Sequence, residues 1–409
     1  MSTSQLLYFH CPEVALSFRA KLLTAENPDV AAQLVAQLPL QSTLGHVVIS
    51  GEAFWLPTRI VHLGRDRMVP RHPGAVYLNA VGGSLCLTYG NVTESAPVNK
   101  VADVEAADLP ALVQLGRLVY EHTVASARHT LLTIHLALHP QTPSTHNLKL
   151  TTGNHHHPQE HKYNSSRSFD KPLPLTTPSS QLQTWHTALT TITTATTTIW
   201  LHMPPSIQRV KWGLIPSGAG TGAQYFSVLV HLKSFLLHLG CDVLYRLLKI
   251  SLYPDLPLAV VQRMTREFLV VNFNTFDMLV DLGVDEMGAT GEVYLRGVGT
   301  VACKEEYRVL TGALFSYVCR MHRWVHLVFP WNLGVAFPQR RVEEILEMAG
   351  AVGGFRAGCV GMGMVLEEAV DGVDIQGLEG GVGVGGRVGG KSNAMGVKGV
   401  VESVEEAPV

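Results

Sequence analysis

Two segments of biased composition divide the chain and leave only two stretches with the pattern of a folded core. Residues 172–208 contain no Asp, Glu, Lys or Arg, and nine of the fifteen residues from Thr184 to Thr198 are threonine. Residues 350–409 hold 17 of the chain's 38 glycines. Neither segment shows a sustained period of 2 or 3.6 residues, so neither predicts an apolar face that could offset the entropy of ordering the chain.

We therefore interpret residues 140–206 as a low-complexity Thr/Pro/His-rich linker or as an artefact of the gene model. Residues 350–409 are interpreted as a Gly/Val-rich disordered tail. Because lengthening a connection costs only about 0.6 kcal/mol per doubling, we expect residues 140–206 to be dispensable for the folding of both flanking domains. The run His155-His156-His157 inside this segment receives no function.

The first patterned region, residues 1–139, alternates short apolar runs with turn residues. Asn27-Pro28-Asp29 predicts a helix start, and a second helix is expected over 109–125 after Asp108. Four apolar runs predict strands: 46–50, 60–63, 84–89 and 131–136. Short strands separated by regular turns favour a barrel or a sandwich.

The second patterned region, residues 207–349, is helical. Apolar residues recur at helical spacing from Tyr225 to Leu239 and from Val260 to Leu279, and further helices are expected near 304–327 and 339–348. Several amphipathic helices with short links predict a bundle. The predicted fold class is α+β: an N-terminal barrel followed by an all-α helical bundle.

Bulk composition narrows the classes of function. With 46% hydrophobic residues and a net charge of −2, the chain is not expected to be disordered as a whole, and it has no basic field for nucleic acid. Six cysteines without regular spacing fit a reducing compartment, and neither a signal segment nor an apolar run of membrane-spanning length is visible. We expect a cytoplasmic protein that binds neither nucleic acid nor membrane.

Four stretches resemble a known family. GHVVISGEAFWLPTRIVHLGR at 45–65 and GAVYLNAVGGSLCLTYGNVTESAPVNK at 74–100 are similar to the cyclophilin-like β-barrel of the cucumopine synthase family. REFLVVNFNTFDMLVDLG at 266–283 and MHRWVHLVFPWNLGVAFPQRRVEEILEMA at 321–349 resemble its C-terminal helical bundle. Residues 140–206 and 350–409 depart from the family pattern.

The resemblance implies an opine synthase that condenses an amino acid such as L-histidine with a 2-oxo acid such as 2-oxoglutarate. In that family the imine is captured by the imidazole ring, which implies that no cofactor is needed. The expected partners are these small molecules, with a homo-oligomer possible. Two alternatives stay open: a non-catalytic small-molecule-binding protein with the same barrel, and a peptidyl-prolyl isomerase, which the barrel alone suggests.

The barrel segment concentrates polar groups that suit such substrates. Arginine binds carboxylates through a bidentate fork, so we predict that Arg59 binds a substrate carboxylate, although Arg65, Arg67 and Arg71 lie nearby and solvated loop charges are the alternative. His62 or Glu94 is predicted to move the proton. Arg59 and His62 have opposite parity, so they can share a pocket only if Arg59 lies in a turn or a bulge intervenes. Further substrate-binding candidates are Trp55, Tyr89, Asn99 and Lys100.

A second candidate group lies on the predicted helix 304–327. Cys319, His322 and His326 share one face, but HRWVH lacks the glutamate of a zinc-binding HExxH helix and no fourth ligand is visible, so we predict no metal. His322 and Arg323 are expected to line an interdomain pocket, with satisfied core histidines as the alternative. Gly218 to Gly222 is interpreted as a helix-entry loop, because it lacks both the P-loop lysine and a Rossmann context.

Overall fold

The computed structural model describes residues 5–65, 68–126, 130–138, 184–211, 222–271 and 275–331. The chain divides into two compact units, residues 1–339 and 340–409, and everything described belongs to the first. That unit contains an antiparallel, nearly closed sheet followed by a helical bundle, which confirms the predicted α+β class. The expectations for residues 140–183, 339–348 and 350–409 fall outside the described residues.

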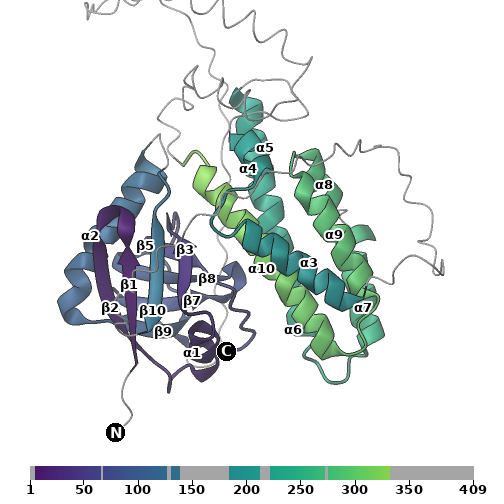
Figure 1. The fold of residues 1–409 in the computed structure, drawn as a ribbon, viewed down its shortest axis with the longest axis horizontal. Helices are drawn as coiled ribbons and strands as arrows, with labels where there is room; N and C mark the ends of the chain where they lie inside the picture. Colours follow the sequence, from purple (N-terminus) through teal and green to yellow (C-terminus); the bar gives the residue numbers. More distant parts are fainter. Residues whose placement is uncertain are drawn as a thin grey trace, which may run out of the picture. The chain divides into compact units, whose positions relative to one another are not determined.

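The described strands form one antiparallel sheet in the order β3-β10-β1-β2-β9-β7-β8-β5-β4, with β6 paired to β9 (Figure 1). The two ends of this order, β3 and β4, are separated in the chain by Leu44 alone, so the edges of the sheet meet and the barrel nearly closes. The amide of Leu44 donates to the carbonyl of Leu132, 2.9 Å away, which carries the pairing across the junction. The strands are β1 Leu6–Cys11, β2 Leu16–Leu22, β3 Leu40–Thr43, β4 Gly45–His46, β5 Gly51–Pro57, β6 Met68–Val69, β7 Ala75–Asn79, β8 Ser84–Val92, β9 Val98–Val104 and β10 Thr133–Leu138.

Alternate residues of the strands serve two separate cores, because side chains on a strand point to opposite faces. The inner face of β5 and β8 contributes Phe54, Leu56, Leu85 and Leu87 to a core that helix α2 (Leu109–Tyr120) completes. The outer face of the same strands contributes Trp55 and Cys86 to a second core, shared with the bundle.

The helices and strands predicted for the barrel are confirmed in part. The predicted helix start at Asn27 gives α1 (Pro28–Val35), and α2 continues through a π-helical turn at Glu121–Ala125. The predicted strand 60–63 is wrong: β5 ends at Pro57 and residues 58–65 form no strand. These residues leave the sheet toward the bundle, where Val61 and Leu63 pack, so their apolar side chains reflect burial and not sheet pairing.

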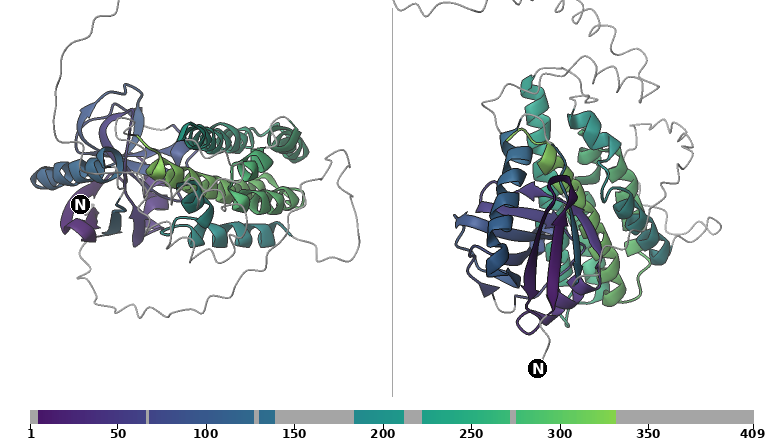
Figure 2. Two further views of the ribbon diagram at one scale, coloured as in Figure 1. Left: turned by 90° about the horizontal axis from the view of Figure 1, so that it is seen from above. Right: turned by 60° about the vertical axis from the view of Figure 1, so that its left-hand side comes forward.

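Helix α10 (Lys304–Val328), 25 residues long, runs through the middle of the bundle (Figure 2). Nearly all of its second half is buried, polar residues included, because the sheet covers one side and helices cover the others. The neighbouring elements are α3 Trp185–Thr198, α4 Pro205–Lys211, α5 Gly222–Leu237, a π-helical turn His238–Leu244, α6 Tyr245–Ile250, α7 Leu258–Arg266, a π-helical turn Glu267–Val271, α8 Thr275–Asp281 and α9 Asp285–Val298.

Helix α3 corrects the domain boundaries expected from the sequence. It lies inside the segment 140–206 interpreted as a linker, yet Ala188 and Ile192 are fully buried against the bundle. A Cβ atom on Gly297 of α9 would lie 2.6 Å from the Cβ of Ala188, which shows how closely the two helices pack. Helix α3 therefore packs as part of the bundle, and we expect its removal to destabilise the bundle core.

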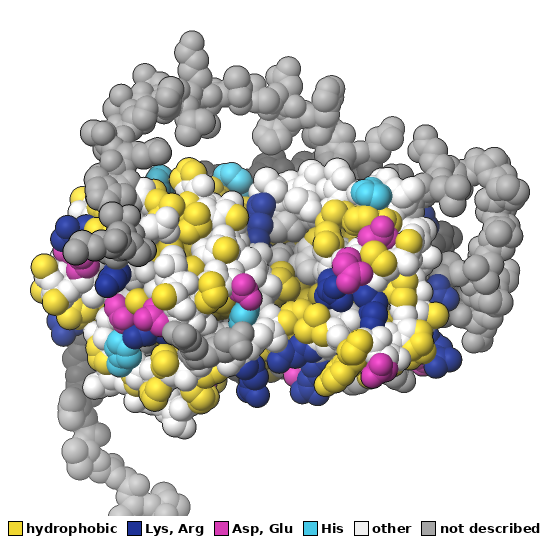
Figure 3. Space-filling model, turned by 90° about the horizontal axis from the view of Figure 1, so that it is seen from below, with side chains coloured by type: hydrophobic (Ala, Val, Ile, Leu, Met, Phe, Trp, Pro, Cys, Tyr) yellow, Lys and Arg dark blue, Asp and Glu magenta, His cyan; other side chains and the backbone are white. Residues whose placement is uncertain are grey.

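One described stretch, Ser227–Ile250, is long and apolar enough to cross a membrane by length and composition alone. Core helices pass the same test, and in this stretch Leu229, Leu232 and Leu236 are fully buried in the bundle core. Figure 3 shows one face of the molecule, on which acidic, basic and apolar side chains are interspersed.

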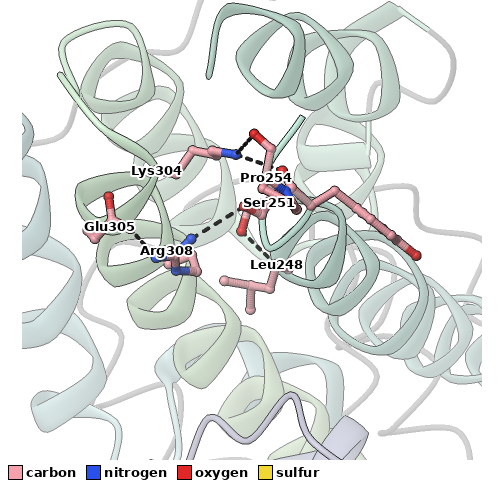
Figure 4. Close-up of polar contacts among 7 residues, drawn as sticks. Leu248, Ser251, Pro254, Lys304, Glu305 and Arg308 are labelled. Carbon is pink, nitrogen blue, oxygen red and sulfur yellow. Dashed lines mark hydrogen bonds and ion pairs between the residues drawn. The ribbon is translucent and has the colours of Figure 1, made fainter. Parts of the chain in front are cut away.

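The N-terminal end of α10 is fixed to the end of α6 by cations (Figure 4). The Lys304 ammonium donates to the carbonyls of Tyr253 (2.7 Å) and Pro254 (3.2 Å), and Arg308 Nη1 donates to the carbonyl of Ser251 (3.3 Å). Cations beside the free carbonyls of a helix end are stabilising. These contacts tie the first turns of α10 to the end of α6.

Candidate functional site

The candidate site lies where the outer face of the sheet meets α10. Trp55, Cys86 and Tyr77 are direct neighbours across β5, β8 and β7, so their side chains form one row on the outer face. Helix α10 presents Arg323 and His326 to this row. The guanidinium carbon of Arg323 lies 4.6 Å from the centre of the Trp55 ring, and the His326 ring meets the same indole edge-on at 5.4 Å.

Arg323 reaches the sheet through the turn between β7 and β8. Its Nη2 atom donates to Ser84 Oγ at 2.6 Å and to the carbonyl of Gly82 at 3.4 Å. A Cβ atom on Gly82 would lie 2.7 Å from Nη2, and Gly83, at φ +54°, would bring one to 3.2 Å from Cβ of Cys319. The two glycines therefore permit the close approach of α10, and a side chain at Gly82 would displace the guanidinium.

His326 has a defined tautomer. Its Nε2 atom lies 3.0 Å from the carbonyl of His46, and because a carbonyl only accepts, Nε2 carries the proton. The same carbonyl accepts the indole N–H of Trp55 at 3.1 Å. The remaining nitrogen, Nδ1, is thus a lone-pair acceptor, and it faces the Lys233 ammonium at 3.4 Å.

Lys233, on α5, is the centre of the bundle side of the site. Its Nζ atom also lies 3.3 Å from Nε2 of His322 and 5.2 Å from the centre of the Trp331 ring. Burial, with the positive charge of Arg323, lowers the pKa of Lys233 to about 8. Burial and the neighbouring cations likewise hold the pKa values of His322 and His326 well below the usual 6.5, so both imidazoles are neutral at pH 7.

The buried cations of this interface lack carboxylate partners. Among the described residues no ion pair involves Arg323, Arg320 or Lys233. Arg323 Nε is buried without a hydrogen-bond acceptor in that same part of the chain. An unpaired buried charge is unfavourable, so this arrangement is expected only where an anion completes it.

A carboxylate does lie at the barrel edge of the row. Glu94 Oε2 accepts from Ser50 Oγ at 2.5 Å and pairs with Arg71 Nη2 at 3.2 Å. The Arg71 guanidinium lies 5.1 Å from the centre of the Tyr77 ring. Burial raises the pKa of the Cys86 thiol to about 11, and the charges of both Arg323 and Arg71 partly oppose this rise.

The structure therefore brings together four of the residues predicted as site residues: Trp55, His322 and Arg323 directly, and Glu94 through Arg71. Their roles remain predictions. The other five lie at different points around the sheet. Tyr89 faces the barrel interior, where its hydroxyl lies 3.0 Å from His46 Nε2 and its ring packs on Gly116 of α2.

Asn99 and Lys100 lie on β9, where Lys100 is the register partner of Tyr77. Asn99 is buried, and its Oδ1 atom has no hydrogen-bond partner among the described residues. The Lys100 ammonium pairs with Asp103 at 2.9 Å and lies 3.4 Å from His72 Nε2.

Arg59 and His62 contact different parts of the bundle. Arg59 lies after the end of β5, which meets the condition set above for sharing a pocket with His62. Its guanidinium nevertheless lies 4.7 Å from the centre of the Trp200 ring and donates to Thr197 Oγ1 at 3.2 Å. His62 is buried, and its carbonyl accepts from the Tyr245 hydroxyl at 2.9 Å.

Lys233, Tyr77 and Cys86 are site residues that the sequence did not identify. For Lys233 a signal exists: it is the one Lys or Arg in the apolar run Val228–Leu239. A single cation inside an apolar helix is either paired or functional. Tyr77 and Cys86 become visible only when the register of β5, β8 and β7 is known.

Within the described ranges, no group of three or more His, Cys, Asp or Glu side chains is arranged to hold a metal ion. Cys319 shares the predicted face with His322, but its thiol is directed to the carbonyl of Val81 at 3.9 Å. A cavity of about 620 Å³ lies along α2, lined by Leu109, Val113, Arg117 and their neighbours. It is shallow and carries only Arg117 and Glu121 as charged groups, so the chemistry favours the interface and not this groove.

Comparisons with known proteins support this view of the fold. Residues 185–328 match the cucumopine synthase C-terminal helical bundle domain, which confirms the resemblance for this part of the chain. The structure of McbB in complex with tryptophan aligns over 80% of this chain and 98% of that chain, with a TM-score of 0.63 and 24% identity, so the two share a fold. The solution structure of the hypothetical protein AF2241 from Archaeoglobus fulgidus covers 33% of this chain and 94% of that one, at TM-score 0.25 and 14% identity, too distant to bear on the fold. No curated protein sequence matches the chain.

Proposed function

We propose that the chain is a condensing enzyme that joins an amino acid to a 2-oxo acid, with L-histidine and 2-oxoglutarate as the first substrate pair to test. The observation that carries this proposal is the buried cationic site: Arg323 and Lys233 face the outer sheet with no carboxylate partner among the described residues. Substrates of this class bring two or three carboxylates, which would supply the missing charge.

The reaction needs carboxylate binding and proton transfer, and the site offers groups for both. The substrate amine attacks the keto carbon, water leaves, and an imine forms; a ring carbon of the amino acid then attacks the imine carbon and loses its proton. Glu94 is suited to remove a proton, while the neutral imidazoles of His322 and His326 can accept one and return it. No electrons are gained or lost, so this sequence of bonds needs no nicotinamide.

The aromatic residues indicate the kind of amino acid. Trp55 and Trp331 both contact His326, with ring centres 5.4 Å and 4.7 Å from its own. Aromatic side chains of this kind stack on flat rings. McbB was solved with tryptophan, so tryptophan is the second amino acid that we propose. Both candidates carry a nucleophilic ring that can close on an imine.

The test is direct product detection. The purified chain is incubated with L-histidine and 2-oxoglutarate, and in parallel with L-tryptophan, and products are identified by mass spectrometry. We expect one product whose mass is the sum of the two substrates less one water, and which lacks a reducible C=N bond. A matched control is Lys304→Met, which removes a cation at the far end of α10.

Absence of product with both amino acids and several 2-oxo acids, from chain shown to be folded, would remove this function. Ligand binding without turnover would favour the non-catalytic alternative. Accelerated isomerisation of a proline peptide would favour the isomerase alternative.

A further inference from the structure

We propose that Lys233 forms a covalent iminium with the 2-oxo acid, which it then passes to the amine of the amino acid. This inference deepens the proposed function and rests on it. It assigns the bundle side of the site to the oxo acid, with Arg323 binding the carboxylate next to the carbonyl.

The first support is the set of side chains that surround the Lys233 amine. Lys233 Nζ is directed to two imidazole nitrogens, at 3.3 Å and 3.4 Å, and to the ring of Trp331, and not to a carboxylate. A structural lysine at a buried interface is normally paired with an acid. Desolvation and a neighbouring cation are the two conditions that make a lysine amine nucleophilic near neutral pH, and here burial and Arg323 supply both.

The second support is the proton path. The tautomer of His326 is fixed by the carbonyl of His46, so its Nδ1 lone pair points at Lys233. His322 Nε2 points at the same ammonium. Each imidazole is neutral, and either can take the proton that Lys233 must lose before it attacks.

The third support is the place for the carboxylate. Arg323 holds Ser84 and Gly82 through Nη2, while its Nε has no acceptor in the described part of the chain. Arg323 and His326 both lie on the Trp55 ring, and His326 in turn contacts Lys233, so the two cations belong to one cluster of side chains. A 2-oxo acid presents a carboxylate and a carbonyl on adjacent carbon atoms, which suits one guanidinium and one amine.

The step balances as follows. The Lys233 ammonium gives one proton to His322 and becomes a neutral amine. Its nitrogen bonds to the keto carbon and, as the second amine proton moves to the oxygen, a carbinolamine forms. The imidazolium returns its proton to the hydroxyl, water leaves, and a Lys233 iminium remains. The amino acid amine then adds to that carbon, the bond to Nζ breaks, and Lys233 leaves as the amine, so nothing is oxidised or reduced.

Borohydride trapping tests the inference. The full chain is incubated with pyruvate or 2-oxoglutarate, reduced with sodium borohydride, digested and mapped by mass spectrometry. We expect the peptide containing Lys233 to gain the mass of the oxo acid less one oxygen atom. Lys233→Arg keeps the charge and abolishes the label; the matched control Lys249→Arg, on α6, has a lysine that also lies over an aromatic ring (5.3 Å from Tyr245) and should keep it.

The trapping is done on the wild-type chain, so the test stands even if Lys233→Arg fails to fold. Product without label on Lys233 overturns the inference and leaves the proposed function intact. Label on Lys233 without product supports the inference and removes the amino acid partner proposed above. Label spread over surface lysines at equal yield also overturns it. A second readout is His322→Gln, which should slow formation of the Lys233 label by roughly 10²- to 10⁴-fold.

Discussion

The inner and outer faces of the sheet contact different parts of this molecule. The inner face of β5 and β8 places Phe54, Leu56, Leu85 and Leu87 in an apolar core closed by α2. The outer face of the same two strands places Trp55, Cys86 and Ser84 beneath the cations and histidines of α10 and α5. The alternation of each strand thus separates the barrel core from the proposed site, which lies in the second core shared with the bundle.

The largest expected effect is the loss of stability when a residue of the inner face is shortened. Leu85 is fully buried, and Leu85→Ala should lower the free energy of unfolding by about 2–5 kcal/mol, through lost transfer energy and the cavity left behind. Its neighbour Cys86 points outward, and Cys86→Ala should lower it by only about 1 kcal/mol. Urea unfolding of the two variants measures the difference. Equal losses would show that the outer face is as much a structural core as the inner one.

This separation of faces was only partly predictable from the sequence. Strand β8 and helix α2 were visible because Leu85, Leu87, Leu112 and Leu115 repeat at the periods of a strand and a helix. Which outward residues meet the bundle was not visible, since it depends on strand register and on the position of α10. Arg323 and His322 were predicted as site residues from their residue types, and Lys233 was not, because it lies inside an apolar helix.

The second largest expected effect is the loss of kcat/KM on replacing Arg323. Because its charge is buried and has no carboxylate partner among the described residues, Arg323→Met should leave the free energy of unfolding unchanged or raise it. The same change removes a charge-assisted contact with substrate worth roughly 1.5–3 kcal/mol, so kcat/KM should fall about 10- to 150-fold. Urea unfolding measures the free energy of unfolding, and steady-state kinetics with the proposed substrates measure kcat/KM.

Arg308→Met is the matched control for Arg323, on the same helix. Arg308 is paired with Glu305 at 2.6 Å, far from the sheet, so its removal should leave kcat/KM unchanged. Destabilisation by Arg323→Met without a kinetic effect would make that residue a structural clamp, and the outer face would lose its proposed carboxylate site.

Helix α3 illustrates a different limit of sequence reasoning. Threonine is a weak helix former, because its branched side chain is restrained and its hydroxyl competes for backbone groups. Here the hydroxyls of Thr191, Thr196 and Thr197 donate to the carbonyls four residues earlier, which satisfies them within the helix. Burial of Ala188 and Ile192 against α9 and α10 then outweighs the poor propensity. Composition alone could not show that packing.

Acid sensitivity should come mainly from the outer face. His322 and His326 have pKa values held well below 6.5, and on the inner side His46 is lowered as well, so the unfolded chain binds more protons below pH 6.5 than the folded chain does. Stability must therefore fall as the pH drops below 6.5, by about 1.4 kcal/mol per pH unit for each such histidine. Urea unfolding at pH 7.5 and 5.5 measures this slope.

His322→Gln should remove about one proton from that slope. If this variant keeps the wild-type slope, His322 is protonated in the folded chain. In that case it could not accept the proton of Lys233.

The smallest expected effect is at Arg59. Its guanidinium lies on the Trp200 ring at the surface and donates to Thr197, so it joins the barrel to the end of α3. Arg59→Ala should lower the free energy of unfolding by about 0.5–1 kcal/mol, the usual value of an exposed cation–π contact, and leave kcat/KM unchanged. Arg59→Lys retains a cation and should recover part of the stability. A 10- to 150-fold loss of kcat/KM in Arg59→Ala, about 1.5–3 kcal/mol, would instead restore the carboxylate-binding role predicted from the sequence. The substrate would then extend from the outer face of β5 toward α3. Arg320 is fully buried, with its guanidinium 5.6 Å from the centre of the same Trp200 ring and its Nη1 donating to Thr43 Oγ1, and would become the next ligand to test.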